Sequence, residues 1–290
     1  MSNPDNQNQD SSHVNWVAPE NNPDIKNSQS RLFGEKSWES RREFVLPREF
    51  FIFQFRCATK IAEKTGEPLE TVIHKYTPFL RQEMWEERES YDSATFGPLP
   101  TMEKIVDNAY ENYKKIVKDE PVPYHDGRRF GCFAFDYDEK SKTIFIHFSN
   151  AEFGQIGPLD KTKIEQRKIE MGDMLKSIRQ DYPESKVVQG ASWLYNMEAY
   201  RRLFPSEYSA GRKIDENVGS WKIGTKIWGQ FLDSNYRLKQ EVVDQFLSRI
   251  EEIPQGIEPD KFSGELLSAL PNPPLKVHAP IDKFYQFYGV

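Results

Sequence analysis

The chain has 290 residues, of which 37% are hydrophobic and 13% aromatic, and it carries a formal net charge of -6. This length is enough for one or two domains, and the aromatic content predicts a core built largely from rings. The acidic balance argues against nucleic acid as a partner, because faces that bind nucleic acid are basic. No apolar run approaches the roughly 18 residues of a membrane span, and no secretory leader is visible. A cytoplasmic protein without a membrane partner is therefore expected.

The two cysteines, Cys57 and Cys132, lie far apart in segments of different predicted type. Two thiols are too few for a disulfide framework or for a metal site that needs several thiolates. His125 and His278 are isolated in the sequence and show no metal-ligand spacing. We therefore expect no metal, and two buried cysteines that act as small apolar side chains.

Residues 1–40 are rich in Asn, Asp, Ser, Gln and Pro and show no apolar periodicity. Such a segment buries too little surface to offset the loss of chain entropy, so the sequence predicts a disordered tail. Residues 41–120 are predicted to form a helical region, and residues 121–290 a mixed α/β domain. Within the helical region, the polar residues 86–98 predict a loop or linker.

Three helices are expected in the helical region, each with an apolar face at helical spacing. The first begins near Pro47 and stops at Gly66, the second opens at Pro68, and the third follows Thr101, whose side chain suits an N-cap. Their apolar positions are Phe51, Phe55, Ala58 and Ala62 in the first helix, Leu69, Val72, Ile73, Tyr76 and Leu80 in the second, and Ile105, Val106, Ala109, Tyr113, Ile116 and Val117 in the third.

After residue 128 the pattern becomes alternating. Residues 129–137 and 143–148 are rich in aromatic and β-branched side chains and are joined by a polar turn, which predicts a β-hairpin. A loop at 149–159 leads to a charged helix at 160–180, whose apolar positions are Ile164, Ile169, Met171, Leu175 and Ile178. The remaining elements are expected in this order: a buried strand from Val187, an aromatic helical turn that ends at Pro205, one or two strands within 221–231, a helix at 236–250, a strand at 275–279 and a helix at 282–288.

This order of elements predicts an α+β fold, with a mixed and mostly antiparallel sheet flanked by helices and a helical N-terminal region. The strand-to-helix junction that starts at Val187 is a position where ligands commonly bind, because it presents backbone amides and side chains at the rim of a sheet. The junction indicates where a site lies and leaves its chemistry open.

Four short motifs carry a resemblance to a known family. They are Ile146-His147-Phe148, Gly157-Pro158-Leu159, Ser192-Trp193-Leu194 and Phe204-Pro205. Over residues 129 to 235 the chain resembles the GNAT superfamily, and in particular acyltransferase-like domains of some bacterial proteins. GNAT enzymes transfer an acyl group from acyl-CoA to an amine.

The resemblance implies where acyl-CoA would bind. In GNAT folds, a splayed strand and the loop after it hold the pantetheine and pyrophosphate, and amides at a helix N-terminus favour the anion. The matching segment here is 148–163. The cofactor-binding residues implied are Phe148, Ser149, Gly154, Gln155 and Gly157.

The residue types near this loop and near the strand-to-helix junction also suggest catalytic and substrate-binding groups. A histidine or glutamate near the loop would take the proton of a small-molecule or peptide amine, and a tyrosine would protonate the departing thiolate. The catalytic candidates are His147, Glu152, Tyr195 and Tyr200, and the substrate-binding candidates are Trp193 and Arg201.

Each candidate also has a purely structural interpretation. His147 suits a hydrogen-bonded histidine within a sheet, and Glu152 suits a solvated loop. The aromatic residues of the junction suit a core. Arg201 suits a surface salt bridge with Glu198 or Glu207.

The main alternative function is a non-catalytic binding or interaction module on the same fold. Pro158 lacks an amide hydrogen, and Asp160 places a negative charge where a phosphate would lie. The aromatic segment 284–288 suits docking in a partner or closure of the core. Two structural features distinguish the hypotheses. Acyl transfer requires an opening between two strands beside Phe148. The enzyme hypothesis fails if the turn after that strand is filled by its own side chains and the Asp160 carboxylate caps the following helix in place of a ligand. A hydrolase is disfavoured because no activated nucleophile can be placed, and the sequence predicts no oligomeric state.

Overall fold

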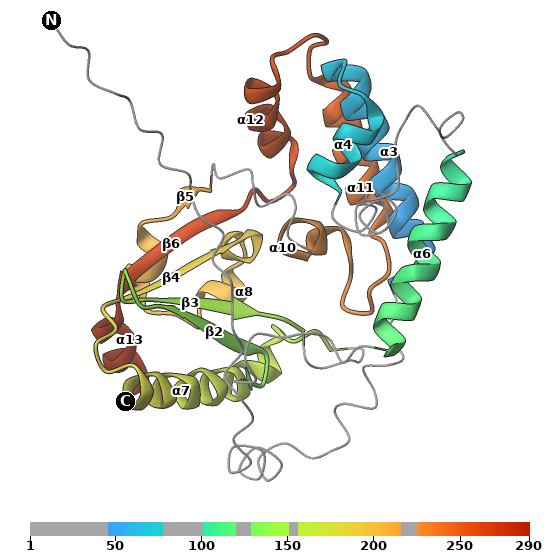
Figure 1. Ribbon diagram of the computed structural model, residues 1–290. Helices are drawn as coiled ribbons and strands as arrows, with labels where there is room; N and C mark the ends of the chain where they lie inside the picture. The colour runs from blue at the N-terminus through green and yellow to red at the C-terminus, as the bar shows by residue number, and fades with distance from the viewer. Residues whose placement is uncertain (1–45, 78–100, 120–128, 151–155, 216–224) are drawn as a thin grey trace, which may run out of the picture.

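The computed structural model describes residues 46–77, 101–119, 129–150, 156–215 and 225–290. It has an α+β fold in which helices pack on a six-stranded sheet of mixed, mostly antiparallel strands (Figure 1). The predicted fold class is confirmed. Within these residues no helix is long and apolar enough to cross a membrane. The tail predicted for residues 1–40 and the loop predicted for residues 86–98 lie outside the described residues.

The sheet has the strand order β1-β2-β3-β4-β6-β5. Every neighbouring pair is antiparallel except β3 and β4, which run parallel. β2 and β3 form the predicted hairpin, in which the Asp138 carboxylate accepts hydrogen bonds from Lys140 N at 3.0 Å and Ser141 Oγ at 2.6 Å. The strands are β1 Arg129–Phe130, β2 Phe133–Asp138, β3 Thr143–Phe148, β4 Val187–Ser192, β5 Lys213–Ile214 and β6 Leu275–Pro280.

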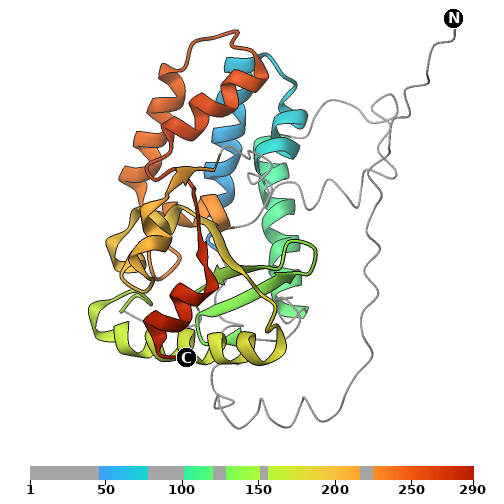
Figure 2. The ribbon, with the colours of Figure 1, turned by 90° about the vertical axis from the view of Figure 1, so that its left-hand side faces the viewer.

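One face of the sheet packs against α7 (Ile164–Asp181), which follows the short helix η2 (Lys161–Lys163), and against α13 (Ile281–Tyr288) (Figures 1 and 2). The short helices η3 (Trp193–Asn196), α8 (Glu198–Arg201) and α9 (Ser206–Ala210) complete this core. We call it the sheet core. The apolar positions predicted for α7 are confirmed except Ile169, which is 65% exposed.

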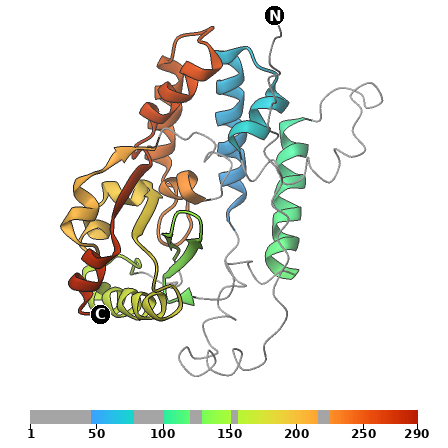
Figure 3. The same ribbon diagram turned by 60° about the vertical axis from the view of Figure 1, so that its left-hand side comes forward.

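A second core is built from helices alone and lies on the other side of the molecule from α7 (Figures 1 and 3). Its central helix is α3, where the Phe53 ring contacts the rings of Trp228, Phe231 and Phe246. The elements of this helical core are α3 Arg48–Thr65, α4 Leu69–Tyr76, α6 Met102–Asp119, α10 Thr225–Trp228, η5 Gly229–Phe231, α11 Gln240–Glu252 and α12 Pro259–Ala269. Residues 225–269 therefore pack with the N-terminal helices, which differs from the division into 41–120 and 121–290 expected from the sequence.

The first three helices begin where the sequence predicts them. Gly66 ends α3 in a left-handed conformation with φ of 73°, and its amide donates to Ala62 O at 2.8 Å. Pro68 precedes α4, and Thr101 precedes α6. Leu80, predicted in the second helix, lies outside the described residues.

Two predictions in the second half are wrong. Residues 225–231 are helical, as α10 and η5, and not strands, because Ile227, Trp228 and Phe231 are spaced to share one helical face that the helical core buries. The remainder of the expected strand segment, residues 221–224, lies outside the described residues. The helix predicted from Tyr236 begins instead at Gln240, because Asp233 Oδ1 accepts hydrogen bonds from Asn235 N and Arg237 N and holds a turn there.

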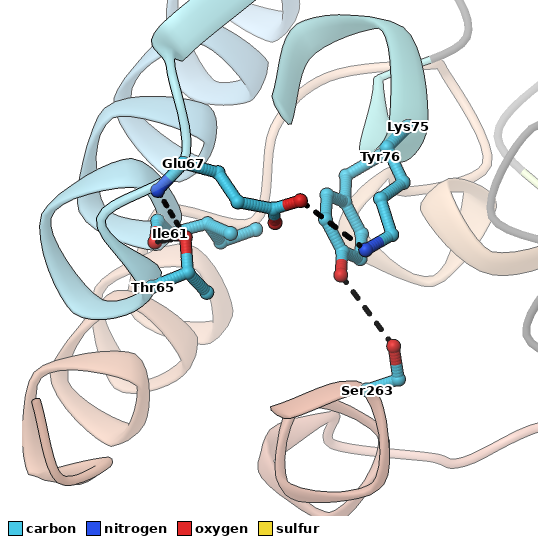
Figure 4. A network of polar contacts seen from close by, with 6 residues as sticks. All are labelled: Ile61, Thr65, Glu67, Lys75, Tyr76 and Ser263. Carbon is cyan, nitrogen blue, oxygen red and sulfur yellow. Dashed lines mark hydrogen bonds and ion pairs between the residues drawn. The ribbon is translucent and has the colours of Figure 1, made fainter. Parts of the chain in front are cut away.

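Polar contacts join three helices of the helical core (Figure 4). Between α3 and α4, the Glu67 carboxylate lies 3.6 Å from Lys75 Nζ, and Glu67 N donates to Thr65 Oγ1 at 3.2 Å. Between α4 and α12, the hydroxyl groups of Tyr76 and Ser263 are 3.4 Å apart. These contacts fix the position of α4 at the end of the helical core.

Both cysteines are buried and neither forms a disulfide, as predicted, but Cys132 Sγ accepts a hydrogen bond from the Arg167 guanidinium and is not a purely apolar side chain. Cys57 lies in the helical core, where burial raises the pKa of its thiol. Cys132 lies in the turn between β1 and β2. Within the described residues no group of three or more metal-ligating side chains is present.

Gln54, in the middle of α3, provides a test of the helical core. Its side chain is 0% exposed, and among the described residues neither its amide nitrogen nor its amide oxygen has a hydrogen-bond partner. Such a group loses its hydration without compensation, at a cost of about 1–3 kcal/mol. We expect Gln54→Leu to raise the free energy of unfolding by a similar amount, measured by urea denaturation.

Gln230 is the matched control, because both the nitrogen and the oxygen of its buried amide have a hydrogen-bond partner. Its Nε2 donates to Ile227 O at 2.9 Å, and its Oε1 accepts from Asn272 N at 2.9 Å. The same substitution, Gln230→Leu, should lower the free energy of unfolding by about 1–3 kcal/mol. Equal effects of the two substitutions would contradict this account.

Candidate functional site

The candidate site lies where the two parallel strands separate. β3 and β4 pair only through Thr143, Ile144 and Phe145, which face Val187, Val188 and Gln189. Beyond this point, β3 continues to Phe148 in register with β2 alone, and β4 continues to Ser192 in register with β6 alone. The last three residues of β3 and the last three residues of β4 are therefore not paired with one another, so the two strands separate beside Phe148.

Aromatic side chains fill the sheet-core side of this separation. The Phe148 ring contacts the rings of Phe133 and Tyr200, each at 5.3 Å between centroids. Tyr195 packs against Tyr200 with ring centroids 5.1 Å apart. Phe148 therefore belongs to an aromatic cluster that also holds both predicted tyrosines.

The hydroxyl groups of this cluster lie in the interior. Tyr195 Oη is 3.0 Å from Tyr208 Oη, and both are directly over Gly190 in β4, where only a residue without a side chain leaves room for them. Burial raises the pKa values of Tyr195, Tyr200 and Tyr208 well above their usual range. At neutral pH all three are protonated and can act only as proton donors.

The opposite face of the hairpin carries His147. Its Nε2 lies 2.7 Å from Asp136 Oδ2 of β2, and the two side chains are 39% and 45% exposed. Asp136 faces Phe145 across the hairpin, so it lies diagonally across from His147 on the same face of the sheet. The predicted base therefore has a carboxylate partner, which sequence reasoning missed.

Hydrogen bonds within the protein hold the two described ends of the loop after β3. Ser149 N donates to Cys132 O at 2.9 Å, and its hydroxyl accepts from the Arg129 guanidinium. Gly157 O accepts from Asp160 N at 3.1 Å, and Gly157 lies beside Ser234, in the segment between η5 and α11. The other three predicted residues of the loop, Glu152, Gly154 and Gln155, lie outside the described residues.

Asp160 caps the helix that follows. Its Oδ1 accepts hydrogen bonds from Thr162 N at 2.9 Å and Thr162 Oγ1 at 2.8 Å. These bonds, with a contribution from Arg202 and Lys161, lower the pKa of Asp160. A phosphate at this helix start would meet a carboxylate that already uses the Thr162 amide.

The two predicted substrate-binding residues hold the junction after β4. The Arg201 guanidinium donates to Asn196 O at 2.7 Å and to Tyr195 O at 3.2 Å, so it pairs with main-chain carbonyls and not with Glu198 or Glu207. Trp193 is partly exposed at the start of η3, and its carbonyl accepts from Asn196 Nδ2 at 2.8 Å. Both side chains lie at the junction that the sequence indicates.

A buried ion pair supports the start of the loop. Arg167 and Glu170 of α7 are 3.0 Å apart with side chains 1% and 8% exposed, and Glu170 Oε2 accepts from Cys132 N at 3.0 Å. Cys132 in turn binds Ser149. An Arg and a Glu three residues apart on a helix suit an ion pair. The rest of this helix is also charged, so the sequence suggested an exposed face and gave no sign that the pair is buried.

Searches with this chain found no match among protein-family models, curated proteins or solved structures.

Proposed function

We propose that this chain is an acyltransferase-like protein that moves an acyl group from acyl-CoA to an amine. The observation that carries the proposal is the separation of β3 from β4 after Phe145, within the single parallel pair of the sheet. Strand ends that part in this way leave main-chain groups of both strands without a partner in the sheet, and an extended thioester arm is a ligand suited to such groups.

The chemistry assigned to the site uses two proton transfers. The amine nitrogen attacks the thioester carbonyl, the C–N bond forms, and His147 takes the proton that the amine loses. The C–S bond then breaks, and the thiolate takes a proton to give free CoA. Tyr200, whose ring contacts the ring of Phe148 at the end of β3, is assigned the donor role.

A second candidate function is a non-catalytic binding or interaction module on the same fold. The observation that favours it is the cap on η2, because the Asp160 carboxylate uses the amide that an anion would need. The deep burial of the tyrosine hydroxyls agrees with this alternative, since a donor with no access to solvent needs the core to open.

Calorimetric titration with acetyl-CoA and with CoA separates the two candidates. The proposal expects saturable binding of both, followed by release of free thiol from acetyl-CoA when a primary amine is added. Absence of binding at millimolar ligand would remove the acyltransferase and leave the non-catalytic module.

Substitution of Asp160 tests whether CoA binds at the start of η2. Asp160→Ala removes a negative charge and frees the Thr162 amide, so we expect CoA to bind more tightly, by about three- to tenfold. The loss of the cap should lower the free energy of unfolding by about 0.5–2 kcal/mol. Asp173→Ala is the control, because Asp173 carries the same charge on the exposed surface of α7, where it pairs with Lys176. An affinity that rises equally in both variants would point to net charge alone.

A further inference from the structure

We propose that Lys213 and Lys276, which face each other across β5 and β6, bind an anionic group of the acceptor amine. The acceptor is then a small amine that carries a carboxylate or a phosphate close to its amino group. The inference rests on the proposed function and names the class of acceptor for the same site.

The alternation of side chains along β6 defines the face of the sheet on which the two lysines lie. Val277 and Ala279 are buried in the sheet core, whereas Lys276 and His278 are exposed. Lys213 is also exposed and is directly opposite Lys276, so the two share one face. We call this the open face, because the sheet core and α7 lie on the other face.

The two lysines repel each other in the absence of an anion. Directly opposite side chains of antiparallel strands have Cβ atoms about 5 Å apart, and like charges at this spacing are destabilising. In the part of the chain that the structure describes, neither ammonium group has an ion-pair or hydrogen-bond partner. An anion between Lys213 and Lys276 would replace this repulsion with two charge-assisted contacts.

Protection of the sheet edge accounts for only one of the two lysines. Lysine on an edge strand discourages pairing with another sheet, and β5 is an edge strand (Figure 1). β6, however, lies between β4 and β5. A positive charge on β6 opposite the first adds repulsion within the sheet, so Lys276 needs another explanation.

The lysine pair lies beside the separated strands. Ala191, in the part of β4 that is no longer paired with β3, is directly opposite Lys276. Neighbouring strands are about 5 Å apart, so Lys276 is one strand from the separation and Lys213 is two. His147 and Ala191 are each two residues beyond the last pair of β3 and β4, and are therefore level with each other. An amine at the separation can place an anion a few bonds away within reach of the lysines.

The test compares acceptors that differ in their anionic group. β-Alanine and its amide form one pair, and phosphoethanolamine and ethanolamine form the other, each with acetyl-CoA and the full-length chain. The variants are Lys213→Gln, Lys276→Gln and the double variant. Lys186→Gln is the matched control, because Lys186 is exposed and carries the same charge at the start of β4, whereas the separation is at the end of that strand.

We expect the wild-type chain to prefer the anionic member of at least one pair by about five- to tenfold in KM, and to lose this preference at high salt. Each single lysine substitution should reduce the preference about two- to fivefold, and Lys186→Gln should preserve it. The pair of acceptors that shows the preference identifies the anion as a carboxylate or a phosphate.

The stability of the variants distinguishes a binding role from a structural one. Lys276→Gln removes the repulsion between the lysines, so the midpoint of thermal unfolding should rise while the preference for the anionic acceptor falls. A lysine that only supports the fold would lower the midpoint when it is replaced. A lower midpoint would therefore contradict the inference.

A second measurement needs no turnover. NMR of the histidine-labelled chain follows the ring of His278, which is two residues from Lys276 on the open face, during titration with acetate and with inorganic phosphate. His278→Gln assigns the signal. We expect a saturable shift with at least one of the anions, lost in the double lysine variant and kept in Lys186→Gln.

Failure of the inference and failure of the proposed function are distinguishable. A wild-type chain that neither binds acetyl-CoA nor releases thiol with any of the four acceptors would overturn the proposed function, and the His278 titration would then decide whether the lysines bind an anion. The absence of a saturable shift would overturn the anion site. If acetyl-CoA is turned over, equal use of both members of each pair, or an equal loss of preference in Lys186→Gln, would overturn the inference alone.

Discussion

Gly190→Ala is expected to lower the free energy of unfolding by about 1–3 kcal/mol, the usual cost of overpacking a filled core. A Cβ atom at this position would overlap Tyr195 Oη and lie 2.6 Å from Tyr208 Oη. Neither ring has room to retreat, because Tyr195 packs on Phe204 and Tyr208 packs on Phe284, with ring centroids 5.8 and 4.9 Å apart. Thermal or urea unfolding measures the loss.

Two further variants show whether the hydroxyl groups cause the effect. Tyr195→Phe removes the atom nearest to the new methyl group, so it should cost less in the Gly190→Ala background than in the wild-type chain. Gly172→Ala is the control, because a Cβ there meets only Tyr288 Cδ1 at 3.8 Å, an ordinary contact. Within the helix α7 this change should raise the free energy of unfolding by about 0.5–1 kcal/mol. Additive losses from Gly190→Ala and Tyr195→Phe would contradict the steric account.

The elements that the sequence predicts correctly are those with a strong local signal. The first three helices have a continuous apolar face and clear boundary residues, such as Gly66. The hairpin of β2 and β3 has alternating side chains on both sides of a polar turn. In each case the signal comes from residues near one another in the chain, so no tertiary contact was needed.

The elements predicted wrongly depend on distant partners. Trp228 and Phe231 have a strand-like composition, but the ring of Phe53 in α3, far away in the sequence, buries them in helical form. The helix α12 was missed, although Phe262 and Leu266 follow one helical face. The packing of residues 225–269 with the N-terminal helices could not be inferred, because a chain pattern does not identify which core an apolar face joins.

In the candidate site, too, the sequence predicts features that have a local motif and misses features that depend on contacts between distant residues. The sequence located the strand end at His147 and the junction at Trp193, because both carry local motifs. The contact between His147 and Asp136 depends on the hairpin register, which composition does not specify. Arg167 and Glu170 looked solvated because their helix is charged throughout, but they are buried and contact the turn at Cys132.

Removing one member of the Arg167–Glu170 pair should have the largest effect on stability. Glu170→Ala leaves the Arg167 guanidinium, 1% exposed, without its carboxylate, and leaves Cys132 N without its acceptor. Removing one partner of a buried ion pair costs about 3–5 kcal/mol. We expect a loss of this size in the free energy of unfolding measured by urea denaturation.

Replacing both members separates the buried charge from the rest of the contact. Arg167→Met with Glu170→Gln removes both charges and keeps an oxygen that can accept from Cys132 N, so this double variant should lose much less stability than Glu170→Ala. Asp173→Ala is the surface control, because Asp173 and Lys176 have the same spacing on α7 but are 54% and 66% exposed, and its effect should stay within about 0.5 kcal/mol. A double variant as unstable as Glu170→Ala would contradict this account, because the double variant buries no charge and keeps an acceptor for Cys132 N. Because Cys132 O binds Ser149 N, the double variant also tests whether the start of the loop after β3 keeps its position when the charges beneath it are gone.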